Sequence, residues 1–117
     1  MDIEEFLEEG RRLAKALYIF KDIEVLDKTD HTIKFRLLID IDLYVQVYVN
    51  AQKAKTNFVL ICRGERLYGR DSEGGQRHRH PFGDPLGHDF GEEGLREVSL
   101  EEFVSEIQQF LEDSGLL

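Results

Sequence analysis

The sequence lacks most of the residues that would tie the chain to an oxidising compartment or to a membrane. Among its 117 residues there is a single cysteine, Cys62, so an intramolecular disulfide is excluded. No apolar run reaches the roughly 20 residues that a membrane-spanning helix needs. The acidic start of the chain, residues 1–5, is also unlike a secretory signal. We therefore expect a cytoplasmic protein with no membrane partner.

Glycine and proline are sparse except in one stretch. Both prolines, eight of the ten glycines and three of the four histidines fall within residues 64–94. The chain length suits one domain, residues 1–117, and an apolar fraction of 41% is adequate for its core. A compact domain rarely holds a structureless loop this long unless the loop is functional or disordered. Because the stretch is rich in His and Arg, we interpret it as functional.

The net charge of −9 disfavours non-specific binding to nucleic acid, which depends on neutralising phosphates. A local cluster can still bind one phosphate, and residues 63–79 contain five arginines and no lysine. The planar guanidinium matches phosphate oxygens in pairs. The alternative is that these arginines form ordinary surface ion pairs, and the sequence leaves both open.

Hydrophobic periodicity predicts an α+β fold. A helical stripe predicts a helix over residues 2–18, and a capping box at Ser99–Glu102 opens a second helix that ends near Gly115. Between them, alternation or short apolar runs predict strands near residues 22–25, 33–39, 43–49 and 56–62, with a further strand near 65–68. Short connections favour a meander. We expect a twisted antiparallel sheet of four to five strands, flanked by an N-terminal and a C-terminal helix, with a long Gly/His-rich loop before the last helix.

The pattern His78-Arg79-His80 is the sharpest chemical feature. In extended backbone both imidazoles project from one face, and imidazole titrates near neutral pH. Cleavage of RNA without a metal needs a base, an acid and a cation for the phosphorane charge. We therefore expect an acid–base pair, His78 and His80, with Arg70 as phosphate clamp and Tyr68 as a positioning group or proton donor. An orienting carboxylate would come from Asp71, Asp84 or Asp89.

The same residues offer a metal site. His78, His80 and His88 provide three imidazoles near several carboxylates, a set suited to zinc, manganese or iron. This alternative predicts a metal-binding protein or a small hydrolase with a divalent transition metal as cofactor, whereas the first needs no cofactor. A third interpretation is structural, with the histidines hydrogen-bonded to the backbone of a glycine-rich loop.

From Tyr68 onward the sequence resembles the TumE-type toxins of toxin–antitoxin pairs. The resemblance rests on Arg70-Asp71, followed by His78, His80-Pro81 and His88, and covers about the second half of the chain. Two features depart from the family: an insert at residues 72–76, and the absence of an adjacent His-His pair. The resemblance implies a strand-rich body with a C-terminal helix, suspected RNase activity, an RNA substrate and a neutralising antitoxin protein.

A non-catalytic interaction domain is the remaining alternative. Tyr44 and Tyr48 lie four residues apart on a predicted strand and share a face, where a core or homodimer contact is favoured over a platform for bases. The last helix is acidic and would suit solvent or a basic partner. The remaining histidine, His31, lies in a turn and is interpreted as a surface residue.

Overall fold

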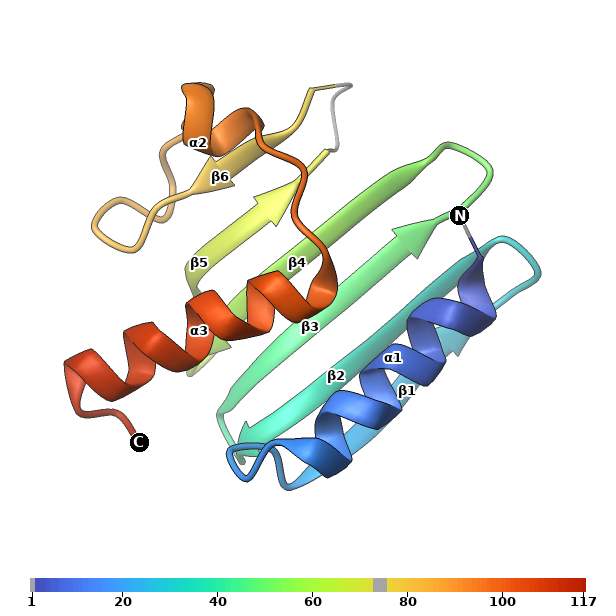
Figure 1. Ribbon diagram of the computed structural model, residues 1–117, viewed down its shortest axis with the longest axis horizontal. Helices are drawn as coiled ribbons and strands as arrows, with labels where there is room; N and C mark the ends of the chain where they lie inside the picture. Colours follow the sequence, from blue (N-terminus) through green and yellow to red (C-terminus); the bar gives the residue numbers. More distant parts are fainter. Residues whose placement is uncertain (1, 73–75) are drawn as a thin grey trace.

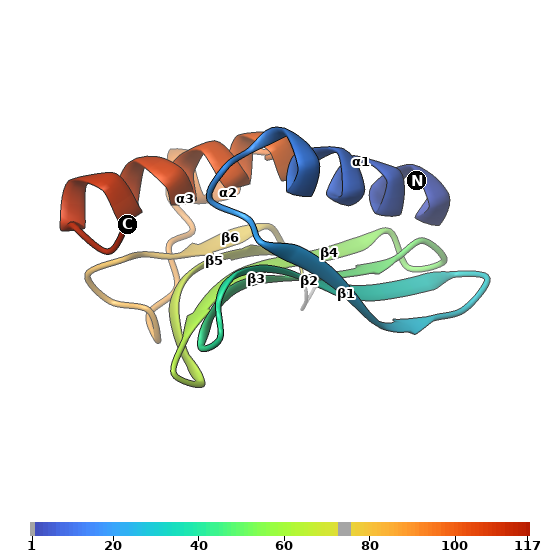
Figure 2. The ribbon, with the colours of Figure 1, turned by 90° about the horizontal axis from the view of Figure 1, so that it is seen from below.

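The computed structural model describes residues 2–72 and 76–117, which form one open antiparallel sheet with helices on one face (Figure 1). Seen from below, α1, α2 and α3 all lie above the sheet, and its other face carries no helix (Figure 2). The elements, in chain order, are α1 (Ile3–Ala16), β1 (Asp22–Lys28), β2 (Thr32–Asp40), β3 (Leu43–Asn50), β4 (Lys55–Cys62), β5 (Glu65–Asp71), β6 (His78–His80), α2 (Glu92–Leu95) and α3 (Leu100–Ser114). The α+β class and the two flanking helices are as predicted.

Alternation along the central strands explains why the sheet has two different faces. In β2 and β3 every second residue is buried and its neighbours are half-exposed. Phe35 and Leu37 of β2 and Val45 and Val47 of β3 are fully buried beneath the helices. Burying each such side chain contributes about 1.5–3 kcal/mol. The half-exposed set between them forms what we call the open face.

Each long helix has a distinct start and a buried stripe. The Asp2 side chain caps α1 by accepting from the Glu4 amide, and Gly10 lets the helix approach the Phe35 ring closely. Ser99 and Glu102 form the predicted capping box at the start of α3. Its buried residues continue the core over β4 and β5: Leu100, Phe103, Val104, Ile107 and Leu111.

The strands follow one another in sequence order from β1 to β6, which confirms the meander. Their number is a correction, because the described residues form six strands instead of four to five. The predicted fifth strand runs on to Asp71, and His78–His80 pairs with it as β6. Much of the predicted loop is therefore regular structure; part of the insert, residues 73–75, lies outside the described residues. In the part of the chain described, no helix has the length and apolar character to span a membrane.

Candidate functional site: a histidine cluster on the open face

The β5–β6 pairing brings three of the expected site residues together. Asp71 is opposite His78, and Gly69 is opposite His80. Directly opposed residues of an antiparallel pair point to the same face. The core residues Phe58 and Leu60 oppose Arg70 and Tyr68, so the alternate positions, including Asp71, belong to the open face. His78 and His80 therefore project from one face, as expected for extended backbone.

His88 joins them through a short return of the chain. Asp89 forms an isolated antiparallel bridge with Arg79, in which each backbone amide donates to the other's carbonyl. The residues flanking Asp89 consequently lie beside those flanking Arg79. The imidazole centroids of His88 and His80 are 4.8 Å apart, and the Phe90 ring lies 5.2 Å from the His78 ring. Phe90 therefore borders the cluster.

The cluster is compact and mostly shielded from solvent. His78 Nε2 lies 3.1 Å from Asp71 Oδ1, and His80 Nε2 lies 3.3 Å from Asp71 Oδ2, so one carboxylate contacts both rings. His78 and His80 are 7% and 4% exposed, whereas His88 is exposed. Among the described residues, His78, His80 and His88 each offer one ring nitrogen, and these atoms lie within 4.8 Å of one another. The three residues of the metal alternative are therefore adjacent.

The hydrogen-bond partners constrain where protons can be. His78 Nδ1 is 3.0 Å from the Gln76 carbonyl, which can only accept, so this nitrogen carries a proton. His78 Nε2 then faces Asp71 either with a second proton or with a lone pair. Two lone pairs at that distance require a cation between them. The site is thus arranged for a positive charge beside Asp71.

His80 has a different environment. Its Nδ1 is buried without a hydrogen-bond partner among the described residues. Burial, and then the positive charge of Arg66, lower the pKa of His80, with Asp71 opposing them. The lowered pKa favours the neutral ring, and if Nε2 donates to Asp71, Nδ1 carries a lone pair. That lone pair could bind a metal ion.

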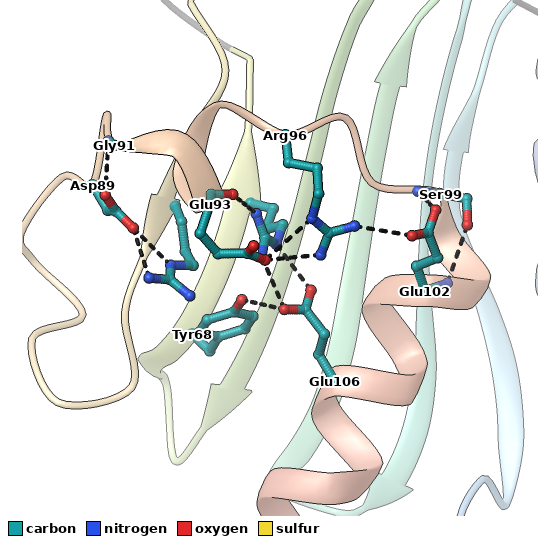
Figure 3. Close-up of polar contacts among 10 residues, drawn as sticks. Tyr68, Asp89, Gly91, Glu93, Arg96, Ser99, Glu102 and Glu106 are labelled. Carbon is teal, nitrogen blue, oxygen red and sulfur yellow. Dashed lines mark hydrogen bonds and ion pairs between the residues drawn. The ribbon is translucent and has the colours of Figure 1, made fainter.

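Arg70 and Tyr68 do not join the histidines. They lie on the helix-facing side of β5, where Glu106 of α3 accepts from Tyr68 Oη at 2.7 Å and from Arg70 Nε at 2.9 Å. Arg70 also donates to the Glu93 carbonyl at 2.7 Å and to its carboxylate at 2.6 Å. Its side chain is 5% exposed. Figure 3 shows this network between α2, α3 and the sheet, with Arg96 linking Glu93 to Glu102.

The pKa values in this network follow from its geometry. Burial, and then the hydrogen bond to Glu106, raise the pKa of Tyr68 to about 12. Burial opposes the charge of Arg70, but its bonds with Glu106 keep the pKa above the ordinary value. Arg96 and then Arg70 lower the pKa of Glu93 to about 2. Four of the five N–H groups of Arg70 therefore already donate to Glu93 and Glu106, although Arg70 borders a cavity together with Asp71 and His78.

The other predicted orienting groups have separate tasks. Asp89 binds Arg79 through Oδ2 at 3.0 Å and 2.7 Å, and its Oδ1 accepts from the Gly91 amide. Asp84 is exposed in the turn between Pro81 and Gly87. Asp71 is therefore the carboxylate that contacts the ring nitrogens of the cluster. Glu106, which fixes Tyr68 and Arg70, was not identified from the sequence, because 36 residues separate it from Arg70.

A cavity of about 490 Å³ lies at the end of β5, between α1 and the segment that joins α2 to α3. Asp71 and His78 form part of its wall, and Arg77 and Arg96 stand at its polar side beside the carboxylates of Glu97 and Glu102. Phe6 and Phe58 provide an apolar floor. Its guanidinium groups are balanced by ion pairs, so the cavity shows no net preference for an anion.

The two tyrosines of the interaction alternative are not in the core. Tyr44 and Tyr48 are half-exposed on the open face, and the guanidinium carbon of Arg36 lies 4.4 Å from the Tyr44 ring centroid. His31 is exposed in its turn, as expected.

Comparison with known proteins adds no identification. The chain matches no protein-family model, no curated protein and no solved structure. Its function has to follow from the chemistry of its own residues.

Proposed function

We propose that His78, His80 and His88 bind a divalent transition metal ion, and that the bound metal serves a hydrolytic reaction on the open face of the sheet. The observation that carries the proposal is the meeting of three ring nitrogens within 4.8 Å, together with a buried His80 Nδ1 that has no hydrogen-bond partner among the residues that the structure describes. Zinc, manganese and iron are the candidates, because imidazole suits all three.

The surroundings favour a metal with a free coordination position. Three protein ligands are typical of catalytic metal sites, whereas closed structural sites use four. Asp71 supplies negative charge next to both rings and can orient His80 by accepting its Nε2–H, as carboxylates do around metal-bound histidines. The exposure of His88 leaves one side of the cluster accessible. A metal there would polarise a substrate oxygen or lower the pKa of a bound water.

A second candidate is RNA cleavage without a metal, because Asp71 contacts both His78 and His80 and would orient them as a pair. One imidazole would take the 2′-hydroxyl proton as the 2′-oxygen attacks phosphorus. The other would protonate the departing 5′-oxygen, leaving a 2′,3′-cyclic phosphate and a 5′-hydroxyl. This candidate loses Arg70 as phosphate clamp and Tyr68 as donor, since both are bound by Glu106. The resemblance to TumE-type toxins, with its implied antitoxin, accompanies this candidate.

Cobalt(II) binding tests the first candidate, because tetrahedral cobalt with nitrogen ligands has a visible spectrum that reports its coordination. Protein stripped with a chelator is titrated with cobalt(II), and the titration is repeated for His78→Ala, His80→Ala and His88→Ala. His31→Ala is the matched control, because this histidine is exposed in a distant turn. We expect stoichiometric binding that each cluster substitution weakens and the control leaves unchanged. Equal binding by all variants would remove the metal site.

RNA cleavage in excess EDTA separates the two candidates. Cleavage by the wild type that is lost in a folded His78→Ala/His80→Ala variant would support the metal-free mechanism. Cleavage that appears only when cobalt, manganese or zinc is restored would support the metal. If the protein neither binds metal nor cleaves RNA, both candidates fail and the non-catalytic interaction domain becomes the better interpretation.

A further inference from the structure

The open face of the sheet carries side chains in two straight rows that end at the histidine cluster. The strand registers place Lys34, Tyr48, Asn57, Asp71 and His78 in one row, each opposite the next. A parallel row contains Arg36, Gln46, Val59, Gly69 and His80. With strands about 4.8 Å apart, each row extends roughly 19 Å from β2 to β6.

The charge of this face differs from that of the whole molecule. The net charge of the chain is −9, yet β2 to β5 place four cations on the open face, Lys34, Arg36, Lys55 and Arg66, against the two carboxylates of Asp40 and Asp71. None of the four forms an ion pair with a carboxylate among the described residues. The acids of β1, opposite Lys34 and Arg36, mark the far limit of this basic strip.

By contrast, the arginines on the helix side are neutralised. Arg70, Arg79 and Arg96 are all ion-paired. Among the described residues, four of the cations without an ion pair lie on the open face, and Lys15 of α1 and Lys53 of the β3–β4 turn lie elsewhere. Since phosphate neutralisation by Lys and Arg supplies most of the affinity for nucleic acid, this grouping favours a polyanion at the open face.

The face also has aromatic and amide groups beside the cations. Lys34, Gln46, Tyr48, Asn57 and Val59 surround a depression of about 300 Å³. Tyr48 offers a ring for stacking, and the amides of Gln46 and Asn57 offer hydrogen-bond donors and acceptors for the edge of a base. Arg36 lies over the Tyr44 ring and steadies it as a second platform. Cations, aromatic rings and amide groups thus lie side by side on this face, a combination typical of surfaces that bind single-stranded nucleic acid.

We infer that the open face binds single-stranded nucleic acid, with one base in the depression beside Tyr48 and the adjoining phosphodiester directed along the rows to His78 and His80. Unpaired bases stack on Tyr44 and Tyr48, and phosphates meet Lys34, Arg36 and Arg66. Gly69 has no side chain of its own in this row, and the side chains of Val59 and His80 lie on either side of it. The binding face is independent of the metal proposal; the identification of the bound strand as substrate rests on that proposal.

Fluorescence anisotropy tests the inference with a labelled single-stranded RNA of about ten nucleotides. All titrations contain EDTA, so that binding is measured without metal-dependent cleavage. Tyr48→Ala is compared with Tyr18→Ala, an exposed tyrosine at the end of α1, and Lys34→Gln with Lys15→Gln, an exposed lysine of the same helix. We expect Tyr48→Ala to weaken binding about fivefold or more. Lys34→Gln should lower the slope of log affinity against log salt by about one, and neither control should have an effect.

Further arms identify the ligand class and exclude other uses of the face. Single-stranded DNA of the same sequence shows whether the 2′-hydroxyl contributes, and a duplex should bind more weakly because its bases are not free to stack. Affinity that is the same for heparin and insensitive to Tyr48→Ala would overturn the inference in favour of a charge effect alone. A wild-type dimer dispersed by Tyr48→Ala in sedimentation would overturn it in favour of self-association. Cobalt(II) titration tests metal binding by the histidines, and anisotropy tests nucleic-acid binding by the open face. Failure of the metal proposal is therefore distinguishable from failure of the nucleic-acid proposal.

Discussion

Asp71 and His78 are direct partners across β5 and β6, and their side chains meet with Oδ1 3.1 Å from Nε2. The other oxygen of the same carboxylate reaches His80. A single substitution at Asp71 therefore changes the charge and the orientation of both rings without removing any ring nitrogen. A substitution at Asp71 can therefore show how much the carboxylate contributes to metal binding while all three histidine ligands remain.

Asp71→Asn is expected to weaken cobalt(II) binding about 10- to 100-fold, the usual effect of losing a carboxylate beside metal-bound histidines. The fold should persist, because asparagine has almost the same shape. Calorimetric titration of the stripped protein measures the change. Asp30→Asn, in an exposed turn, is the control. Unchanged affinity in Asp71→Asn would mean that the carboxylate has no part in the site.

Gly94→Ala is expected to disturb the cluster from the opposite side of the sheet. A Cβ at Gly94 would collide with the backbone carbonyl of Asp89, whose bridge to Arg79 sets the position of His88. We expect weaker cobalt(II) binding together with a loss of stability of about 1–3 kcal/mol, typical of overpacking. Gly83→Ala, in the same segment, has open space at its Cβ and should change neither quantity. Wild-type cobalt affinity in Gly94→Ala would show that the bridge does not control His88.

Arg70→Met tests whether the buried guanidinium of Arg70 stabilises the fold. Its removal leaves the Tyr68 hydroxyl as the remaining donor to Glu106 among the described residues, and breaking a buried pair in this way costs about 3–5 kcal/mol. Urea unfolding provides the measurement. Arg63→Gln, which removes an exposed pair with Asp42 at 3.6 Å, should cost less than about 1 kcal/mol. Equal stability of Arg70→Met and the wild type, together with lost RNA binding, would restore Arg70 as a phosphate ligand.

The depressed pKa of Glu93 predicts a loss of stability in acid. Arg96 and Arg70 hold this pKa at about 2 in the folded protein, below an ordinary value of 4.5. The contribution to folding is therefore complete above about pH 4.5 and disappears as the pH falls from there through about 2. Urea unfolding across this range should show a flatter pH dependence in Glu93→Gln than in the wild type. Glu5→Gln, an exposed carboxylate of α1, should retain the wild-type slope.

Periodicity was enough to predict both long helices and the first four strands. The helix expected over residues 2–18 is Ile3–Ala16, and the capping box begins α3 at Leu100 as predicted. The three-residue strand β6 was missed because it lies among glycines and prolines and has no apolar alternation. It forms because its backbone pairs with β5. This pairing depends on the tertiary structure and cannot be predicted from the local sequence pattern.

The site was predicted in part. The shared face of His78 and His80 follows from extended backbone, and the three histidines named in the metal alternative do lie together. The separation of Arg70 from the histidines could also be predicted from the sequence. Side chains alternate between the two faces of a strand, so Tyr68 and Arg70 point to one face and Asp71 to the other. What the sequence does not contain is the distant partner Glu106, since only the packing of α3 on the sheet brings it to Arg70.

The sequence order of the sheet has a consequence for folding. Each strand pairs with the one made just before it, so every step of sheet growth closes only a short loop, which favours rapid assembly. On the ribosome the sheet can extend strand by strand, and the last hairpin delivers His78 and His80 after the rest of the sheet is in place. The Asp89 return adds His88 later still. A nascent chain would therefore bring its three clustered histidines together only after the first five strands have been made.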